Sequence, residues 1–487
     1  MLYTLIKKEL RSIVLSPKFI GTFIVCSFLI LLSIYTGIRE YRAMSDRYHA
    51  ASLMVEEEKR QITTWGRMND KVYREPDPMQ IFVSGLDYDI GRWSLVSMSS
   101  PAKLSNSAYS DDPIFAVFRV VDFSFITRFV LTLFAILFTY NAINGERENG
   151  TLKLVFSNSV SRVKYIIGKC LGAWLGLTIP ISIPILLGLL LLVLFAVPLS
   201  VSHWIRIILL LILSQALFTL FIIFGVLLST LTRRSSVSFL IGLVTWVTLV
   251  TIIPAASVMA AGQLVHVPRM AEIESQKSGF AQEKWQNFYA DMDERWNEYN
   301  ASANIDGEQN EDLMWSIMER EDSLRREIRE EIYQYGLRLQ EDLQQRKIHQ
   351  EKIAYMLSRL SPVAAYQLGA MRLAGTDTEL KNRYESAINH YSDGFFDHVK
   401  EKQAETGVMG GIMMSISLNE DGSQNISTTR QRNKEVLDLS GLPEFQIAQV
   451  TLAESANGLA VDFGIILLFT LVSLAGAFTA LLKYDVR

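Results

Sequence analysis

A short polar segment at residues 144–156 carries the residue types best suited to couple this chain to a partner. It reads Asn-Gly-Glu-Arg-Glu-Asn-Gly-Thr-Leu-Lys-Leu-Val-Phe and lies between two long apolar runs. Glu146 and Glu148 come early in it, where carboxylates stabilise the positive end of a helix. Leu152 and Phe156 supply an apolar face. The pattern predicts a short amphipathic helix that either lies on lipid or docks into a groove on a soluble protein.

Motifs for catalysis are missing from the sequence. It contains no G-x-x-x-x-G-K-[ST] phosphate loop, no H-E-x-x-H, no C-x-x-C and no G-x-S-x-G. Gly168-Lys169-Cys170 echoes the phosphate loop only superficially, because no strand precedes it and no hydroxyl follows it. We therefore expect a chain that is not itself an enzyme, does not hydrolyse ATP and carries no cofactor of its own.

One segment with helical periodicity, at about residues 378–404, holds four potential metal ligands. They are His390, Asp393, Asp397 and His398. Their i, i+3, i+7, i+8 spacing spreads them over a broad helix face, so a metal site is one interpretation. A solvated polar face explains the same spacing and is the interpretation we favour. No metal site is assigned, and a membrane metalloenzyme is the weakest functional hypothesis.

Six apolar runs are long enough to cross a hydrocarbon core, which takes about 20 helical residues. They are residues 18–38, 126–143, 166–196, 204–231, 237–261 and 459–482. The sequence therefore predicts an all-α polytopic membrane protein with six transmembrane helices. Charge is scarce in such segments, so any charged residue there is a candidate for function.

Basic residues in the short connecting segments predict the orientation of the spans. Residues 1–17, 144–165 and 483–487 are rich in Lys and Arg, whereas the turn at 197–203 has neither. We therefore expect both termini on the cytoplasmic side. In the leader, Lys7, Lys8 and Arg11 lie mostly opposite the apolar residues of an amphipathic helix. This pattern is typical of an interfacial helix on the cytoplasmic face.

Two long segments are expected outside the cytoplasm. Residues 39–125 begin as a charged helix and continue with strand and turn residues. Residues 263–457 contain two helical stripes separated near residues 301–311, which predict a long helical hairpin. The run at 412–418 predicts a small β-hairpin. We therefore expect a mainly helical extracytoplasmic domain with minor β structure.

Three charged residues are expected near the outer boundary of the spans: Asp122, Arg128 and Asp462. Either their side chains reach the headgroups, or they form a polar cluster at the outer gate of a pathway. Pro180 and Pro184 lie inside the third span, where each removes a helical hydrogen bond. The resulting kink is either a hinge or a bend in a static bundle.

The order of several short motifs resembles a known family. Glu-Arg-Glu-Asn-Gly-Thr-Leu at 146–152 is followed by Ser-Asn-Ser-Val-Ser-Arg at 157–162 and by Gly-Lys at 168–169. This order resembles the coupling-helix region of ABC type-2 exporter permeases. A subgroup with a large extracytoplasmic insert, related to the permease for nitrous oxide reductase maturation, is similar at further motifs. These are Pro76–Phe82, Gly85–Asp87, Leu360–Gln367 and Lys483–Arg487.

The resemblance implies a permease subunit in the bacterial inner membrane that exports a substrate or transmits conformational work. It would form a homodimer and bind two copies of a separate ABC ATPase, which holds ATP and Mg. Membrane lipid is a further partner, and nucleic acid is not. The residues that would couple to the ATPase are Glu146, Arg147, Glu148, Gly150, Thr151, Leu152, Phe156 and Arg162. The basic leader would be the interfacial connecting helix.

An alternative from another class is a membrane-anchored scaffold or sensor whose extracytoplasmic hairpin binds a partner protein. Six spans are more than an anchor needs, which favours the transporter. The substrate is not readable from the sequence. Spans three to five are almost purely aliphatic, which is compatible with lipid or peptide cargo.

Overall fold

The computed structural model divides the chain into two compact units. Unit 1 comprises Met1–Ile253 and Arg359–Arg487, and unit 2 comprises Pro254–Ser358. The structure describes residues 2–62, 69–87, 90–96, 104–105, 121–157, 160–306, 311–406, 412–418, 424–430, 437, 439, 441–447 and 451–483. Most of the expected basic tail, at 484–487, and part of the expected break in the hairpin, at 307–310, lie outside the described residues.

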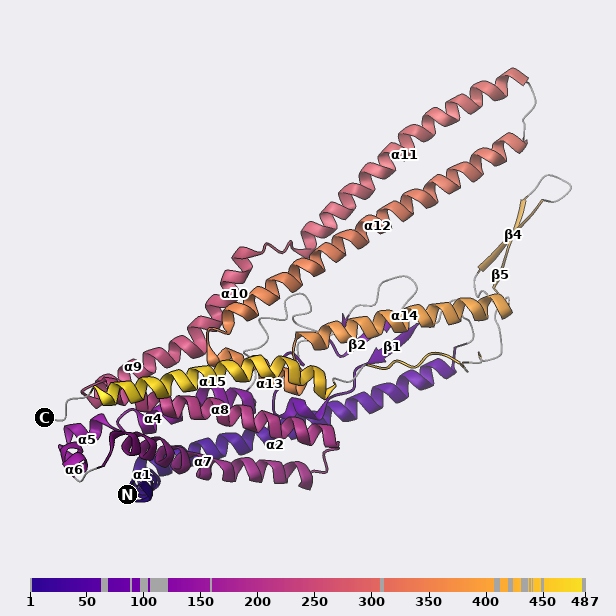
Figure 1. The fold of residues 1–487 in the computed structure, drawn as a ribbon. Helices are drawn as coiled ribbons and strands as arrows, with labels where there is room; N and C mark the ends of the chain where they lie inside the picture. Colours follow the sequence, from indigo (N-terminus) through magenta and orange to yellow (C-terminus); the bar gives the residue numbers. More distant parts are fainter. Residues whose placement is uncertain are drawn as a thin grey trace. The chain divides into compact units, whose positions relative to one another are not determined.

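Six helices in the described part of the chain are long and apolar enough to cross a membrane. They are α2 (Pro17–Arg60), a second helix (Phe123–Glu148), α7 (Arg162–Leu194), α8 (Val201–Leu231), a fifth helix (Ser235–Leu264) and Gly458–Leu482 within α15 (Leu452–Leu482). A helix satisfies its own backbone hydrogen bonds, as a segment in hydrocarbon must. The predicted fold class, an all-α polytopic membrane protein, is confirmed. Both termini lie at the same end of unit 1 (Figure 1).

The second and fifth helices each contain a π-helical turn, which the sequence did not lead us to expect. Their elements are α3 (Phe123–Phe125), η4 (Ile126–Leu131), α4 (Thr132–Thr139), α9 (Ser235–Val247), η5 (Thr248–Ile252) and α10 (Ile253–Leu264). A π turn disturbs the regular ladder of carbonyl acceptors. In η5 the carbonyl of Leu249 accepts a hydrogen bond from the Ser361 hydroxyl. The same hydroxyl accepts from backbone N–H groups at the start of α13 (Pro362–Ala374).

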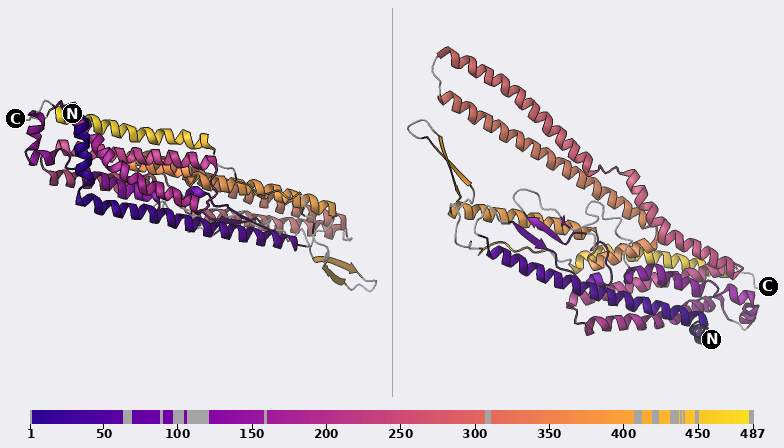
Figure 2. Two further views of the ribbon diagram at one scale, coloured as in Figure 1. Left: turned by 90° about the horizontal axis from the view of Figure 1, so that it is seen from below. Right: turned by 180° about the vertical axis from the view of Figure 1, so that it is seen from behind.

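A further short helix, α1 (Leu2–Val14), runs across the end of the bundle and packs against α7 (Figure 2). Gly168, Gly172 and Gly176 of α7 recur every four residues, so they form a strip without side chains on one helix face. A Cβ atom on Gly172 would lie 2.6 Å from Cβ of Glu9. Small residues permit such close helix contacts. One side of α1 is therefore covered by protein.

The two prolines of the third span lie inside α7 without ending it. The helix runs from Arg162 to Leu194, with Pro184 buried and Pro180 half-buried. The interpretation of these prolines as a hinge stays a prediction.

Beyond the bundle, at the end away from the termini, α2 and α14 (Thr378–Thr406) flank a small sheet (Figure 1). Its strands are antiparallel in the order β1 (Asp70–Tyr73), β2 (Trp93–Val96) and β3 (Leu104–Ser105). Asp70 joins the layers, because it accepts from Lys59 of α2 at 2.7 Å and from the Tyr391 hydroxyl of α14. The expected β-hairpin is also present, as β4 (Ile412–Leu418) and β5 (Gln424–Arg430).

Unit 2 contains the expected helical hairpin. Its arms are α11 (Met270–Asp306) and α12 (Glu311–Ser358), which pack side by side. At 1.5 Å per residue, α12 is about 70 Å long. Aromatic stacking and ion pairs join the arms: the rings of Phe280 and Tyr335 are 4.1 Å apart, and Arg295 is 2.7 Å from Glu321.

We expect Gly172→Val to detach α1 from α7. The new side chain would meet Glu9 Cβ at 2.6 Å and the Ile6 carbonyl oxygen at 3.2 Å, and a backbone atom cannot move aside easily. Overpacking of this kind costs about 1–3 kcal/mol. Trypsin should therefore cut the basic residues of α1 faster in the variant. Gly21→Val is the control, because no atom lies within 4 Å of a Cβ at Gly21. Equal cleavage of both variants and the parent would contradict this packing.

Candidate functional site

The polar segment after the second span forms two short helices, where the sequence predicted one. α5 (Asn144–Glu148) and α6 (Thr151–Ser157) are separated by a turn at Gly150, whose φ is +71°. Glycine adopts this left-handed conformation without steric cost, and it commonly ends a helix. The turn allows α5 and α6 to contact different parts of the protein.

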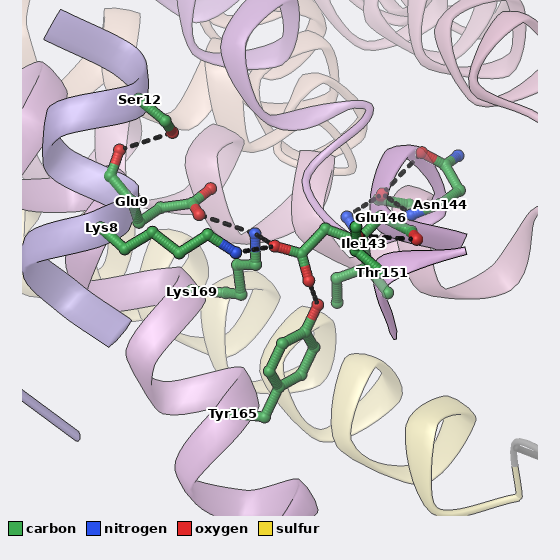
Figure 3. Close-up of polar contacts among 10 residues, drawn as sticks. Lys8, Glu9, Ser12, Ile143, Asn144, Glu146, Thr151, Tyr165 and Lys169 are labelled. Atoms are coloured by element: carbon green, nitrogen blue, oxygen red, sulfur yellow. Dashed lines mark hydrogen bonds and ion pairs between the residues drawn. The ribbon is translucent and has the colours of Figure 1, made fainter. Parts of the chain in front are cut away.

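Glu146 of α5 lies at the centre of a polar network (Figure 3). Its Oε1 atom is 3.0 Å from Nζ of Lys8 and 3.0 Å from Nζ of Lys169. Its Oε2 atom accepts a hydrogen bond from the Tyr165 hydroxyl at 2.6 Å. Lys169 also lies 2.6 Å from Oε2 of Glu9. Lys8 and Glu9 belong to α1, and Tyr165 and Lys169 belong to α7. The Glu146 carboxylate therefore connects α5 to α1 and α7.

The centre of this network is shielded from water. The side chains of Lys169 and Glu9 are 8% and 9% exposed, whereas that of Lys8 is 57% exposed. Salt and water screen buried charges weakly, so each buried charge needs an oppositely charged partner nearby. Removal of one partner would leave a charge buried and unpaired, which costs several kcal/mol. We call Lys8, Glu9, Glu146, Tyr165 and Lys169 the Glu146 network.

Two other residues join α5 to the turn between α8 and α9. The side chain of Asn144 accepts from the Ser229 hydroxyl at 3.0 Å and donates to the Thr232 hydroxyl at 2.9 Å. Glu148 accepts from the backbone N–H of Ser235 at 2.9 Å and from its hydroxyl at 2.7 Å. The five-residue helix α5 therefore contacts four other helices: α1, α7, α8 and α9. It cannot shift without moving these helices or breaking the contacts to them.

The apolar side of α6 is turned toward the bundle. Leu152 is 2% exposed, and the ring of the half-buried Phe156 lies 5.3 Å from that of Tyr165. Leu152 therefore packs inside unit 1, whereas the sequence predicted that it would face a partner. An amphipathic helix covers its apolar stripe with whatever apolar surface is nearest, and here the bundle supplies it. The outward side carries Lys153 and Leu154, which is 65% exposed.

Other residues singled out from the sequence have contacts within the chain. Arg162 donates to the last carbonyl groups of α15, where a cation is favourable. The Thr151 hydroxyl donates to the Glu146 carbonyl oxygen at 3.1 Å. Lys7 and Arg11 are exposed on α1. The coupling role of Arg162 and Thr151 and the interfacial role of Lys7 and Arg11 stay predictions.

Sequence reasoning missed Glu9, Tyr165, Lys169 and Asn144. Lys169 lies within a predicted span, and an ionisable residue in a span is a functional candidate by default. That signal could have found Lys169. Nothing in the sequence pairs it with Glu9, which precedes it by 160 residues.

The residues expected at an outer gate lie at the end of unit 1 away from the termini. Asp122 is buried; it accepts from the Phe125 N–H at 2.7 Å, at the start of α3, and from the Ser84 hydroxyl at 2.9 Å. Arg128 lies in η4, where it is 4% exposed and donates to the side chain of Gln367 in α13. This burial favours a polar cluster over side chains that reach the headgroups.

Asp462 of α15 is fully buried and pairs with different residues. It lies 2.7 Å from Arg359 and 3.1 Å from Arg372 of α13. The helix α13 therefore contacts Arg128 on the second span and Asp462 on the last. No local pattern in the sequence indicates that this segment connects the two spans.

The histidine and aspartate residues of α14 do not converge on one point. His390 and Asp393 are exposed. Across the residues that the structure describes, there is no group of three or more potential metal ligands.

Comparison with known proteins agrees with this architecture. A family model described as ABC-2 family transporter protein matches residues 3–486. The chain therefore belongs to the ABC-2 transporter family: it is a multi-pass membrane protein and a permease component of an ABC transporter. Such a permease is a transport component with a partner ATPase subunit and is not itself catalytic. No curated protein matches the chain.

We expect Lys169→Met and Lys8→Met to differ sharply, although both lysines lie 3.0 Å from the same Glu146 oxygen. Loss of the buried Lys169 leaves two carboxylates without their shared cation and should cost about 3 kcal/mol. Loss of the exposed Lys8 should cost less than about 1 kcal/mol. The midpoint of thermal unfolding in detergent measures the difference. Similar midpoints for the two variants would show that burial does not strengthen this network.

A second expectation concerns pH and Asp377, between α13 and α14. Burial raises the pKa of Asp377 from 3.8 to about 6, although Arg383 lies 3.9 Å away. The stability that this carboxyl contributes is fully present below pH 3.8 and is lost as the pH rises through about 6. Asp377→Asn removes that loss. It should therefore stabilise the protein by about 2 kcal/mol near neutral pH and change little at about pH 4.

The control for Asp377 is Asp397→Asn. The side chain of Asp397 is 79% exposed on the neighbouring helix α14. Thermal unfolding midpoints are measured between about pH 4 and neutral pH. The midpoint of Asp377→Asn relative to the parent should rise with pH, whereas that of Asp397→Asn should not. A constant difference at every pH would contradict the assignment.

Proposed function

We propose that this chain is the permease subunit of an ABC exporter in a bacterial inner membrane, with both termini in the cytoplasm. It pairs with a second copy and binds two copies of a separate ATPase. The distribution of basic residues over the short connecting segments supports this orientation. The observation that carries the proposal is the position of α5, which contacts four helices while the adjoining α6 has an exposed outer side.

The proposed coupling begins at α6. Lys153 and Leu154 face outward, so they are the residues that a groove on the ATPase would contact. Leu152 and Phe156 hold α6 to the bundle and make it move as a unit with its surroundings. ATP and Mg bind to the ATPase, and this chain contributes the surface on which that subunit acts.

Closure of the two ATPase subunits on ATP would displace α6 and the adjoining α5. The Glu146 network would then pass the displacement to α1 and α7, and Asn144 and Glu148 would pass it to α8 and α9. A shift of the permease from 1:99 to 99:1 in favour of one conformation needs about 5.5 kcal/mol of differential binding. Retention of buried ion pairs favours rigid movement of these helices over separation, because separation would unpair the charges.

At the other end, α13 would receive this movement. It contacts the second span through Arg128 and the last span through Asp462, and Ser361 joins its start to η5. Movement of these spans would therefore reach α13 and could either open a pathway or do work on the region outside the membrane. Both outcomes follow from the same coupling.

A scaffold or sensor is the second candidate function. Exposed aromatic residues on the hairpin of unit 2, such as Tyr289 and Tyr333, favour it because aromatic side chains are common in protein interfaces. A scaffold would form a stable assembly without an ATPase, so the following experiment separates the two functions.

The test is Leu154→Glu in a permease co-expressed with its cognate ATPase. A charge at this exposed position should disrupt an apolar contact and lower the amount of co-purified ATPase about ten-fold or more. Permease-dependent ATP hydrolysis should fall in parallel. Leu53→Glu is the matched control, since Leu53 is 67% exposed on the distant end of α2. Undiminished ATPase binding by Leu154→Glu would refute the proposed contact, and an ATPase-free parent would favour the scaffold.

A further inference from the structure

A cavity of about 650 Å³ lies in unit 1, near the ends of α2 and α8 that face away from the termini. Its volume suits a small molecule or a lipid headgroup. The walls come from α2, the chain before η2 (Pro78–Ile81), the start of α8, the start of α14 and residues 445–447. Four aromatic side chains line it: Tyr41, Tyr48, Tyr73 and Phe445.

The first group of charges at the cavity has an excess of cations. Asp87 lies 2.5 Å from Arg74 and 2.8 Å from Arg92, so one carboxylate serves two guanidinium groups. Burial acts to raise the pKa of Asp87, but these two cations outweigh it and the net pKa is lowered. Asp87 therefore stays ionised between the two guanidinium groups.

The second group contains more widely spaced charges. Arg206 is buried, and its Nη1 atom is 4.0 Å from Oδ2 of Asp77. Arg383 is 3.9 Å from Asp377. Its Nη2 atom is buried and has no hydrogen-bond partner among the described residues. Hydrogen bonds to oxygen are about 2.7–3.2 Å long, so both pairs are too far apart for direct hydrogen bonds.

Charged groups of both signs line the cavity. The guanidinium groups are those of Arg74, Arg206 and Arg383, and the carboxylates are those of Glu75, Asp77 and Asp87. Glu75 at the cavity and Glu454 near Arg383 are exposed, so water screens their charges. The N-terminal ends of α8 and α14 also border the cavity, and helix N-termini carry partial positive charge.

We propose that this cavity binds an amphipathic ligand through an anionic group, a phosphate or a carboxylate, held by Arg206 and Arg383. Guanidinium groups bind both anions with charge-assisted hydrogen bonds. The aromatic side chains contact the apolar part of the ligand. The source of the anion is either a lipid headgroup at the membrane boundary or a soluble molecule. Occupancy would join the outer ends of α2 and α8 to α14.

Isothermal titration calorimetry on the full-length protein in a non-ionic detergent tests this site. The probes are dihexanoyl phosphatidylglycerol, below its micelle concentration, and inorganic phosphate. We expect saturable binding that Arg206→Gln and Arg383→Gln each weaken about ten-fold or more. Arg346→Gln is the matched control, because Arg346 is exposed on α12 and pairs with Asp342 one helix turn away. It should bind like the parent.

The two probes distinguish the sources. Binding of inorganic phosphate alone would assign the site to a soluble anion, and binding of only the short-chain lipid would assign it to a headgroup with its apolar part. If the Arg206→Gln variant does not fold, the affinity of the Arg383→Gln variant decides the test, because Arg383 is only half-buried. Absence of binding by the parent, or equal affinities for Arg383→Gln and Arg346→Gln, would overturn the proposal. The experiment contains no ATPase, so its outcome is independent of the proposed coupling.

Discussion

The organisation of unit 1 at its terminal end depends on one carboxylate. Glu146 sits on a five-residue helix that has little stability of its own, yet its two oxygens contact Lys8, Tyr165 and Lys169. A helix this short forms only where tertiary contacts support it. In turn, the buried Lys169 and Glu9 are tolerable only because the network neutralises them. Local helix formation and long-range charge pairing therefore stabilise each other.

Buried charged groups also join helices at the other end of unit 1, away from the termini. Asp462 pairs with Arg359 and Arg372, and Arg128 bonds to Gln367, so α13 is joined to two spans. Near the terminal end the charges are paired at hydrogen-bonding distance. At the cavity, by contrast, the Arg206–Asp77 and Arg383–Asp377 pairs are too widely spaced for direct hydrogen bonds. Arginines that line a cavity can bind an anion, whereas closely paired charges between packed helices favour transmission of force.

Close packing adds a second constraint that polar contacts alone would not give. The glycine strip of α7 brings α1 near enough for Glu9 to reach Lys169. Likewise, a Cβ on Gly225 of α8 would lie 1.8 Å from the Thr139 hydroxyl oxygen, so α8 and α4 also approach closely. Backbones that touch leave little freedom to slide, so a displacement at α5 reaches the spans as a movement of packed helices.

Local features of the sequence were enough to predict the membrane-spanning helices, the hairpin and the segment that forms α5 and α6, because length, periodicity and apolar content are local properties. The family resemblance singled out Gly150 as a coupling residue, whereas its positive φ is a finding of the structure. Helix packing, in contrast, determines which face of α6 is covered, that Glu9 meets Lys169, and that α13 joins two spans. These contacts link residues up to 239 positions apart, as between Arg128 and Gln367. Such pairings depend on how helices pack, and a local pattern carries no information about that.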